Sequence, residues 1–246
     1  PYEVSTTVVT GAETSDLTVW EPSGEGPWPV VFAIPGSGGS AIRDLDVFAG
    51  ELASHGVVVF GTDYSGSPEY AVECGYRHVL EVAPDYGGDL TQPVTFFGYS
   101  AGGSGAFWHG LGEDKYGPDA TYGAIPCPPG AERPGIIVSV NACHVTTTEI
   151  EGRIRFWGNP DAQITLISGD GDDVCGAWQS IEGHRLLVEA GYAATYEEIP
   201  DANHWEPVFH DLAYGNYSTL DADHPAGQAT VRATLDANGI RTEPSD

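Results

Sequence analysis

The sequence is poor in positive charge. Its 246 residues contain 36 Asp and Glu against 9 Lys and Arg, which gives a formal net charge of -27. A surface of that sign repels the phosphates of nucleic acids and the headgroups of anionic lipids. We therefore expect no nucleic acid partner, no anionic membrane partner, and a substrate that is neutral or cationic. Solubility is the simplest explanation of the acidity. A saline habitat, in which salt would screen the self-repulsion, is one setting for it that the sequence leaves open.

Methionine and long apolar runs are missing as well. The chain has no Met and begins at Pro1, from which we expect a processed, secreted form whose removed segment was a secretion signal. No apolar run approaches the roughly 18 residues that span a bilayer, so we expect no membrane insertion. With 41% hydrophobic residues and no Ser/Gly/Pro-rich linker, residues 1–246 are predicted to form a single domain.

Cysteine is scarce, and the 4 cysteines are Cys74, Cys127, Cys143 and Cys175. None has CxxC or His/Cys metal spacing, so we predict no metal and no cofactor. An even count is compatible with two disulfides in an oxidising compartment, and buried free thiols are the alternative. Four cysteines allow three pairings, and the sequence leaves the connectivity open.

After residue 28, short apolar runs alternate with longer amphipathic segments, as expected for an α/β protein with a mostly parallel central sheet flanked by helices. The predicted strands of this sheet span residues 29–34, 56–61, 93–98, 135–140, 163–168 and 194–199. The predicted helices span residues 42–56, 75–83, 100–111, 177–191 and 226–239. Before residue 28, residues 5–10 and 16–21 predict two antiparallel edge strands. The apolar face expected for the first helix consists of Ile42, Leu45, Phe48, Ala49 and Leu52.

The stretch "VTFFGYSAGG" (94–103) contains the pattern GxSxG around Ser100. In a glycine-rich chain this pattern also arises by chance, and a turn serine without a chemical role is the alternative. However, the stretch lies between a predicted strand and a predicted helix, which is the setting of a nucleophile elbow. The helix N-terminus there favours a developing negative charge. We predict that Ser100 is a nucleophile.

Serine needs a base to take its proton and a carboxylate to orient that base. The stretch "GDGDDV" follows the strand at 163–168, and "PDANHWEP", with His204, follows the strand at 194–199. Both lie at carboxyl ends of parallel strands, where such sheets place their sites. We predict His204 as the base and favour Asp172 over Asp173 as the acid. Calcium binding by these carboxylates is an alternative, but the spacing of a calcium loop is absent.

Backbone N–H groups that stabilise an oxyanion are expected at two places. One is Ala101, directly after the nucleophile, and the other is Ser37 in the loop "PGSGGS", with Gly38 as the alternative. A phosphate-binding loop is the other interpretation of these glycines, but neither GxGxxG nor a P-loop lysine is present.

The segments "WPVVFAIPGSGG", "ELASHGVVVFGTDY", "GYSAGG", "TLISGDGDD" and "NHWEP" resemble the α/β-hydrolase family in order and spacing, over residues 28–210. Within it, the chain is similar to the lipase, cutinase and polyester-hydrolase (PETase-like) group. The resemblance implies a triad of Ser100, Asp172 and His204 with Ser37 and Ala101 as oxyanion donors. It thus implies a serine carboxylesterase that forms an acyl-enzyme.

The chain departs from the polyester hydrolases at two positions that bind substrate. They usually carry an aromatic residue where Ser37 stands, and a tryptophan where this chain reads "NACHVTT", with His144 as the candidate replacement. The link at 141–162 is too short for a separate helical lid, so we expect no lid domain and an open cleft. Trp205 and Trp178 are expected to line it, although either tryptophan is equally explained by core packing.

Small-molecule or polymeric esters are the expected substrates, and a monomer is the expected state. A peptidase or a thioesterase is the nearest alternative, since both use the same triad. The alternative from another class is a non-catalytic binding protein on a hydrolase fold.

Overall fold

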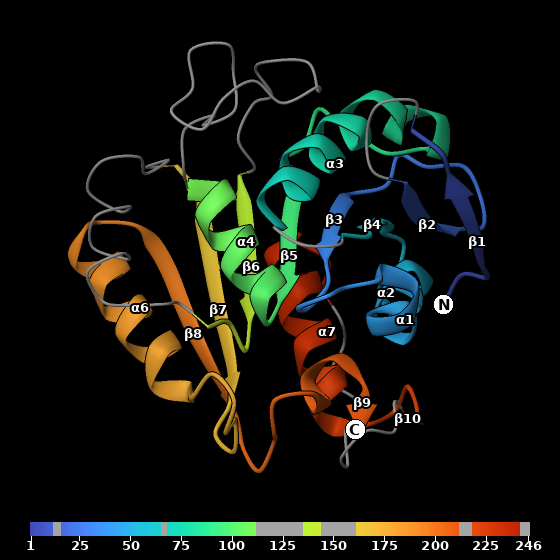
Figure 1. Cartoon of the computed structure of the whole chain (residues 1–246). Coiled ribbons are helices and arrows are strands. Elements are labelled where there is room, and N and C mark those ends of the chain that lie inside the picture. The colour runs from blue at the N-terminus through green and yellow to red at the C-terminus, as the bar shows by residue number, and fades with distance from the viewer. Residues whose placement is uncertain (12–15, 65–67, 112–134, 144–160, 212–217, 242–246) are drawn as a thin grey trace.

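A mixed sheet forms the centre of the molecule (Figure 1). The computed structural model describes residues 1–11, 16–64, 68–111, 135–143, 161–211 and 218–241. The strands of the sheet are β1 (Val4–Val9), β2 (Leu17–Pro22), β3 (Val30–Ile34), β4 (Val58–Thr62), β5 (Thr95–Tyr99), β6 (Ile136–Val140), β7 (Gln163–Gly169) and β8 (Ala193–Ile199). Their order is β1-β2-β4-β3-β5-β6-β7-β8.

Strand β2 runs against the other strands of this sheet. The β1/β2 and β2/β4 pairs are antiparallel, and every pair from β4/β3 to β7/β8 is parallel. The predicted mostly parallel sheet with an antiparallel edge is therefore confirmed. The inner strands β3 to β6 are buried on both faces, which explains their continuous apolar runs.

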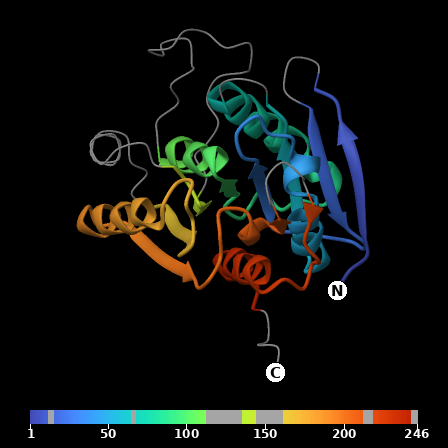
Figure 2. The same cartoon turned by 60° about the horizontal axis from the view of Figure 1, so that its bottom comes forward.

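Helices cover both faces of the sheet (Figure 2). On one face α3 (Pro68–Val82), α4 (Ala101–Leu111) and α6 (Ala177–Glu189) pack against alternate strand residues such as Phe32 and Phe96. On the other face α1 (Ala41–Asp44), α2 (Asp46–Ser54) and α7 (Pro225–Ala237) pack against residues such as Val31 and Phe97. Because neighbouring side chains on a strand point to opposite faces, each strand contributes to both cores.

Short elements complete the described chain. They are the 3-10 helices η1 (Ala83–Tyr86) and η2 (Glu206–Val208) and the pair of strands β9 (His210–Asp211) and β10 (Ser218–Thr219). Among the described residues, every helix is too short or too polar to span a membrane.

One predicted helix is interrupted. Residues 42–56 were expected to form a single helix with Ile42 on its apolar face, but the chain divides into α1 and α2 at Leu45, whose φ is -130° and ψ 6°. The break changes the phase of the helix, so that Ile42 is 44% exposed while Leu45, Phe48 and Leu52 are buried. The expectation for Ile42 was wrong because a helical periodicity holds only across an unbroken helix.

Disulfides are present, as expected. Cys143, after β6, is bonded to Cys175, between β7 and α6. Cys74 on α3 is also disulfide-bonded. Cys127 and most of the link at 141–162, for which a lid was excluded, lie outside the described residues.

Candidate active site

Ser100 lies at a sharp turn between β5 and α4, as the sequence predicted. Its φ is 55°, a left-handed conformation that few residues other than glycine adopt. The turn needs the two flanking glycines, since a Cβ on Gly98 would lie 2.1 Å from the Gly102 carbonyl oxygen and a Cβ on Gly102 2.2 Å from the Ile34 carbonyl oxygen. These contacts leave room only for hydrogen and present the Ser100 hydroxyl at the end of the sheet.

His204 connects Ser100 to an acidic residue. Its Nε2 lies 2.9 Å from the Ser100 Oγ, and its Nδ1 lies 2.9 Å from the Asp172 Oδ1. A carboxylate can only accept, so Nδ1 donates to Asp172 and Nε2 of the neutral ring accepts from the Ser100 hydroxyl. His204 is 2% exposed, and this burial shields both hydrogen bonds from water.

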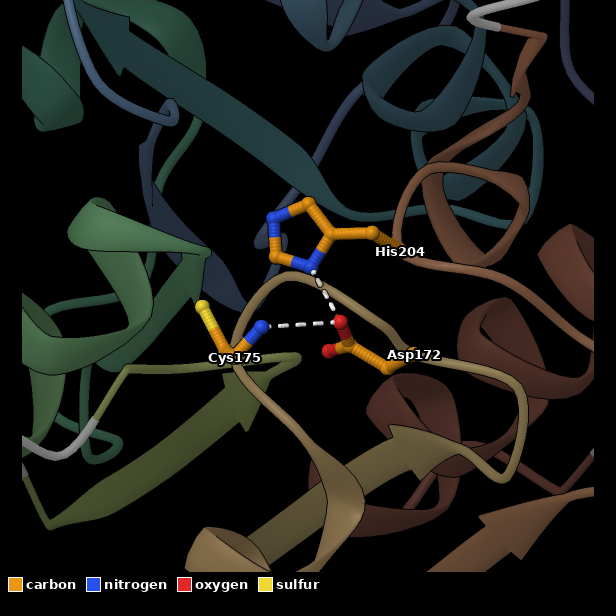
Figure 3. Close-up of side chains that lie close together, drawn as sticks. All are labelled: Asp172, Cys175 and His204. Carbon is orange, nitrogen blue, oxygen red and sulfur yellow. Dashed lines mark hydrogen bonds and ion pairs between the residues drawn. The ribbon is translucent and has the colours of Figure 1, made fainter.

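Asp172 follows β7 and is held by its own loop (Figure 3). Its Oδ1 accepts hydrogen bonds from the backbone N–H groups of Val174 at 2.9 Å and Cys175 at 3.0 Å, besides that of His204. The neighbouring Asp173 is exposed and has no such contact to His204 among the described residues. Of the two candidates, the structure brings Asp172 to the histidine.

The charge of Asp172 is favoured in this setting. Burial disfavours the carboxylate and by itself raises its pKa. The hydrogen bond and charge of His204 and the N–H groups of Cys175 and Val174 outweigh that effect, and they hold the pKa of Asp172 below its usual value. The carboxyl group therefore stays ionised at neutral pH and orients the imidazole.

A pocket of about 210 Å³ opens at Ser100. It is lined by Gly36, Ser37, Arg43, Asp44, Tyr99, Ser100, Val174, His204, Trp205 and His210. The Arg43 guanidinium is paired with the carboxylate of Asp44 at 2.6 Å, so the two charges of the wall offset each other. A pocket of this kind suits a neutral group.

The predicted substrate contacts fall in different places. Trp205 lines the pocket, with its ring 5.3 Å from that of His204 in an edge-to-face arrangement. Trp178 lies on α6, is 63% exposed and is not among the pocket-lining residues. His144 lies outside the described residues.

The loop after β3 faces Ser100. Ser37 lines the pocket, whereas its alternative Gly38 does not. A residue that the sequence analysis missed holds this loop: the buried Tyr64 hydroxyl lies 2.6 Å from the Gly36 carbonyl oxygen and 3.0 Å from that of Pro35. Ala101, the other predicted donor, is the first residue of α4. The stretch "GTDY" at the end of a predicted strand gave no signal of the tyrosine's role.

The described side chains around Asp172 do not form a metal site. Asp172, Cys175 and His204 approach one another closely enough to hold an ion (Figure 3). However, the Cys175 sulfur is in a disulfide, and the acid and the imidazole are hydrogen-bonded to each other. The cluster thus offers no thiolate, which is the form of cysteine that binds metals.

No family model matches the chain, and no curated protein matches it in sequence. Solved structures do match. A truncated carbohydrate esterase from gut microbiota has a TM-score of 0.71 at 16% identity, covering 97% of this chain and 97% of the other. Esterase B from Lactobacillus rhamnosis has a TM-score of 0.72 at 15% identity, covering 98% and 87%. The chain has the α/β-hydrolase fold.

A third match extends over the whole length of the fold. A thermophilic esterase from Thermogutta terrifontis has a TM-score of 0.66 at 15% identity, covering 99% of this chain and 95% of the other. In this chain Ser100 follows β5, Asp172 follows β7 and His204 follows β8.

The lowered pKa of Asp172 predicts a pH-dependent contribution to stability. Because the folded pKa lies below the unfolded value of about 3.9, the stabilisation is complete above that pH and is lost as the pH falls through the folded pKa. We expect Asp172→Asn to lower the free energy of unfolding by about 1–3 kcal/mol near neutral pH. The difference from wild type should narrow below about pH 4. Urea unfolding, monitored by circular dichroism at several pH values, measures this difference in the free energy of unfolding.

Asp173→Asn is the matched control for this experiment. Its exposed carboxylate has no contact to His204, so the variant should change the free energy of unfolding by less than about 0.5 kcal/mol. A difference in the free energy of unfolding between wild type and Asp172→Asn that stays constant with pH would contradict the account.

Proposed function

We propose that the protein is a serine hydrolase of carboxylic esters that works through an acyl-enzyme. The observation that carries the proposal is the continuous chain of hydrogen bonds from Asp172 through His204 to Ser100, at 2.9 Å and 2.9 Å. Support also comes from the neutral pocket at Ser100 and from the esterases among the structures that share the fold. The fold alone does not define a reaction, so the site residues carry the argument.

The reaction begins when His204 Nε2 takes the proton of the Ser100 hydroxyl and Oγ attacks the ester carbonyl carbon. The carbonyl oxygen becomes negative and accepts hydrogen bonds from the N–H groups of Ala101 and Ser37. Collapse of this intermediate breaks the bond to the alcohol, which leaves with the proton from His204. Water, deprotonated by His204, then attacks acyl-Ser100, and the acid leaves as Ser100 recovers its proton. Asp172 remains ionised throughout and orients the imidazole.

Within ester hydrolases we propose a cutinase-like enzyme, with a short acyl group in the pocket and a bulky or polymeric apolar ester across the surface. The small volume of the pocket supports the first part. Three exposed apolar side chains support the second: Val174, which lines the pocket, is 53% exposed, Trp178 is 63% exposed and Ile181 is 47% exposed. On α6 the last two are three residues apart and so lie on one face of the helix. We also propose that the protein is secreted, since disulfides persist in oxidising compartments.

Ser100→Ala should reduce hydrolysis of p-nitrophenyl esters to background, because no other hydroxyl is placed on His204 among the described residues. Asp172→Asn should lower kcat about 10³- to 10⁴-fold, since the imidazole loses its orienting acceptor. Asp173→Asn should leave kcat unchanged. Release of p-nitrophenol across acyl lengths from acetate to laurate measures all three.

Retained turnover by Ser100→Ala would remove Ser100 as the nucleophile. A faster reaction on an anilide than on an ester of the same acyl group would favour the peptidase alternative.

Tyr64→Phe should lower kcat about tenfold while KM changes little. The variant loses the hydrogen bonds to the Pro35 and Gly36 carbonyl groups, and so loosens the loop that carries the Ser37 N–H. Tyr196→Phe is the control, since that hydroxyl bonds Ser168 and Glu198 away from the pocket. Steady-state kinetics on a soluble ester distinguish the two variants. An equal kcat for Tyr64→Phe and Tyr196→Phe would contradict the role of Tyr64 in holding the loop after β3.

The double variant Trp178→Ser, Ile181→Ser should lower hydrolysis of an insoluble polyester about tenfold and leave turnover of p-nitrophenyl butyrate unchanged. The reason is that both side chains are exposed and only the solid substrate reaches them. Val188→Ser, which removes an exposed apolar side chain near the far end of α6, should change neither rate. Unaltered polyester hydrolysis in the double variant would argue against the cutinase-like proposal.

A further inference from the structure

Asn141 occupies the position directly after β6, at the edge of the sheet where the site lies. It is 1% exposed, and its φ of 45° is the left-handed conformation that asparagine tolerates better than most residues. The sequence analysis gave this residue no role. It is not among the residues that line the pocket, and its side-chain hydrogen bonds go to residues other than Ser100, so its burial as a polar group needs another explanation.

The amide of Asn141 joins two of the loops that carry the site. Its Oδ1 accepts a hydrogen bond at 2.9 Å from the N–H of Gly169, the last residue of β7, three positions before Asp172. Its Nδ2 donates to the backbone carbonyl of His204 at 2.7 Å and to that of Asn203 at 3.2 Å. One planar group thus fixes the backbone of the histidine relative to the strand that leads to the acid.

The loop that carries Ser100 is hydrogen-bonded to Val140, the residue before Asn141. The Ser100 N–H donates to the Val140 carbonyl oxygen at 2.9 Å, and the Asn141 N–H donates to the Ile167 carbonyl oxygen at 2.9 Å. The turn after β6 therefore contacts the loops of the nucleophile, the acid and the base together. It contributes no reacting group to any of them.

Only an asparagine meets all of these requirements among residues of this size. The position needs an acceptor toward Gly169, donors toward two carbonyl groups and tolerance of a positive φ. Aspartate supplies the acceptor but no donor, and glycine supplies the conformation but none of the three side-chain hydrogen bonds.

We propose that Asn141 is a positioning residue that sets the distance of His204 from both Ser100 and Asp172. This inference rests on the proposed function. Its physical basis is that triad catalysis requires placement of the base to within a fraction of an ångström, and a displacement of about 1 Å costs about 100-fold in rate. The loop that carries His204 follows β8, which is the edge strand of the sheet in the described part of the chain, so none of the described strands lies on its outer side to hold it.

The test compares Asn141→Asp and Asn141→Gly with wild type. Aspartate keeps the size, the acceptor and the tolerance of positive φ but removes both donor contacts. Glycine removes the side chain without introducing a buried charge, and so provides a second variant if the first does not fold. We expect kcat for p-nitrophenyl butyrate to fall about 10- to 100-fold in both, with KM within about threefold of wild type.

Asn238 provides a matched control. Its amide also joins two elements, accepting from the Thr95 hydroxyl at 2.8 Å and donating to the Thr234 carbonyl at 2.8 Å, at the amino end of β5. Asn238→Asp and Asn238→Gly should lower the thermal midpoint as the Asn141 variants do, but leave kcat unchanged. An equal loss of kcat in the Asn141 and the Asn238 variants would show that Asn141 has a merely structural role and would overturn the proposal.

A second measurement separates this inference from the proposed function. The rate at which a fluorophosphonate labels Ser100, located by peptide mass spectrometry, reports the placement of the base without requiring ester turnover. We expect labelling to slow in the Asn141 variants by the same factor as kcat. Wild-type protein that labels at Ser100 but turns over no ester would refute the proposed function, and slower labelling of the variants would still support the role of Asn141. Labelling at the wild-type rate in both variants would overturn it.

Discussion

The site depends on one constraint of the sheet: strands β5 to β8 are parallel, so their carboxyl ends meet at one edge. Ser100, Asp172 and His204 are far apart in the sequence, yet each follows one of these strands within a few residues. The strain at Ser100 is tolerated because β5 and α4 are both packed into the core, which fixes the turn between them. Burial of the sheet thereby supplies the rigidity that the site needs.

The net charge of the chain and the charges at the pocket have different consequences. The chain as a whole carries a formal charge of -27. In the pocket wall Arg43 is paired with Asp44, and the ionised carboxylate of Asp172 lies next to His204. Acidity therefore explains solubility better than it explains the chemistry. The disulfide between Cys143 and Cys175 adds a covalent bond next to Asp172. The N–H of Cys175 donates a hydrogen bond to the Oδ1 of Asp172.

Much of the fold, and the positions of Ser100, Asp172 and His204 after their strands, could be predicted from the sequence because their signals are local. Apolar runs identify buried strands, and GxSxG between a strand and a helix identifies Ser100, since only small residues fit the turn. The remaining features depend on three-dimensional contacts. The break at Leu45 interrupts a helical periodicity that continues in the sequence, and Tyr64 and Asn141 donate to backbone carbonyl groups distant in the chain, for which no residue pattern exists. The disulfide pairing was open for the same reason.

The central claim is that Ser100 carries the acyl group. The most direct measurement is to quench turnover of p-nitrophenyl acetate with acid and to find the acetylated residue by peptide mass spectrometry. The account predicts one acetyl group per chain, on Ser100, which is absent from the His204→Ala variant because the base that activates the serine is gone. An acetyl group on another residue, or release of p-nitrophenol with no acylated enzyme at any time, would contradict it.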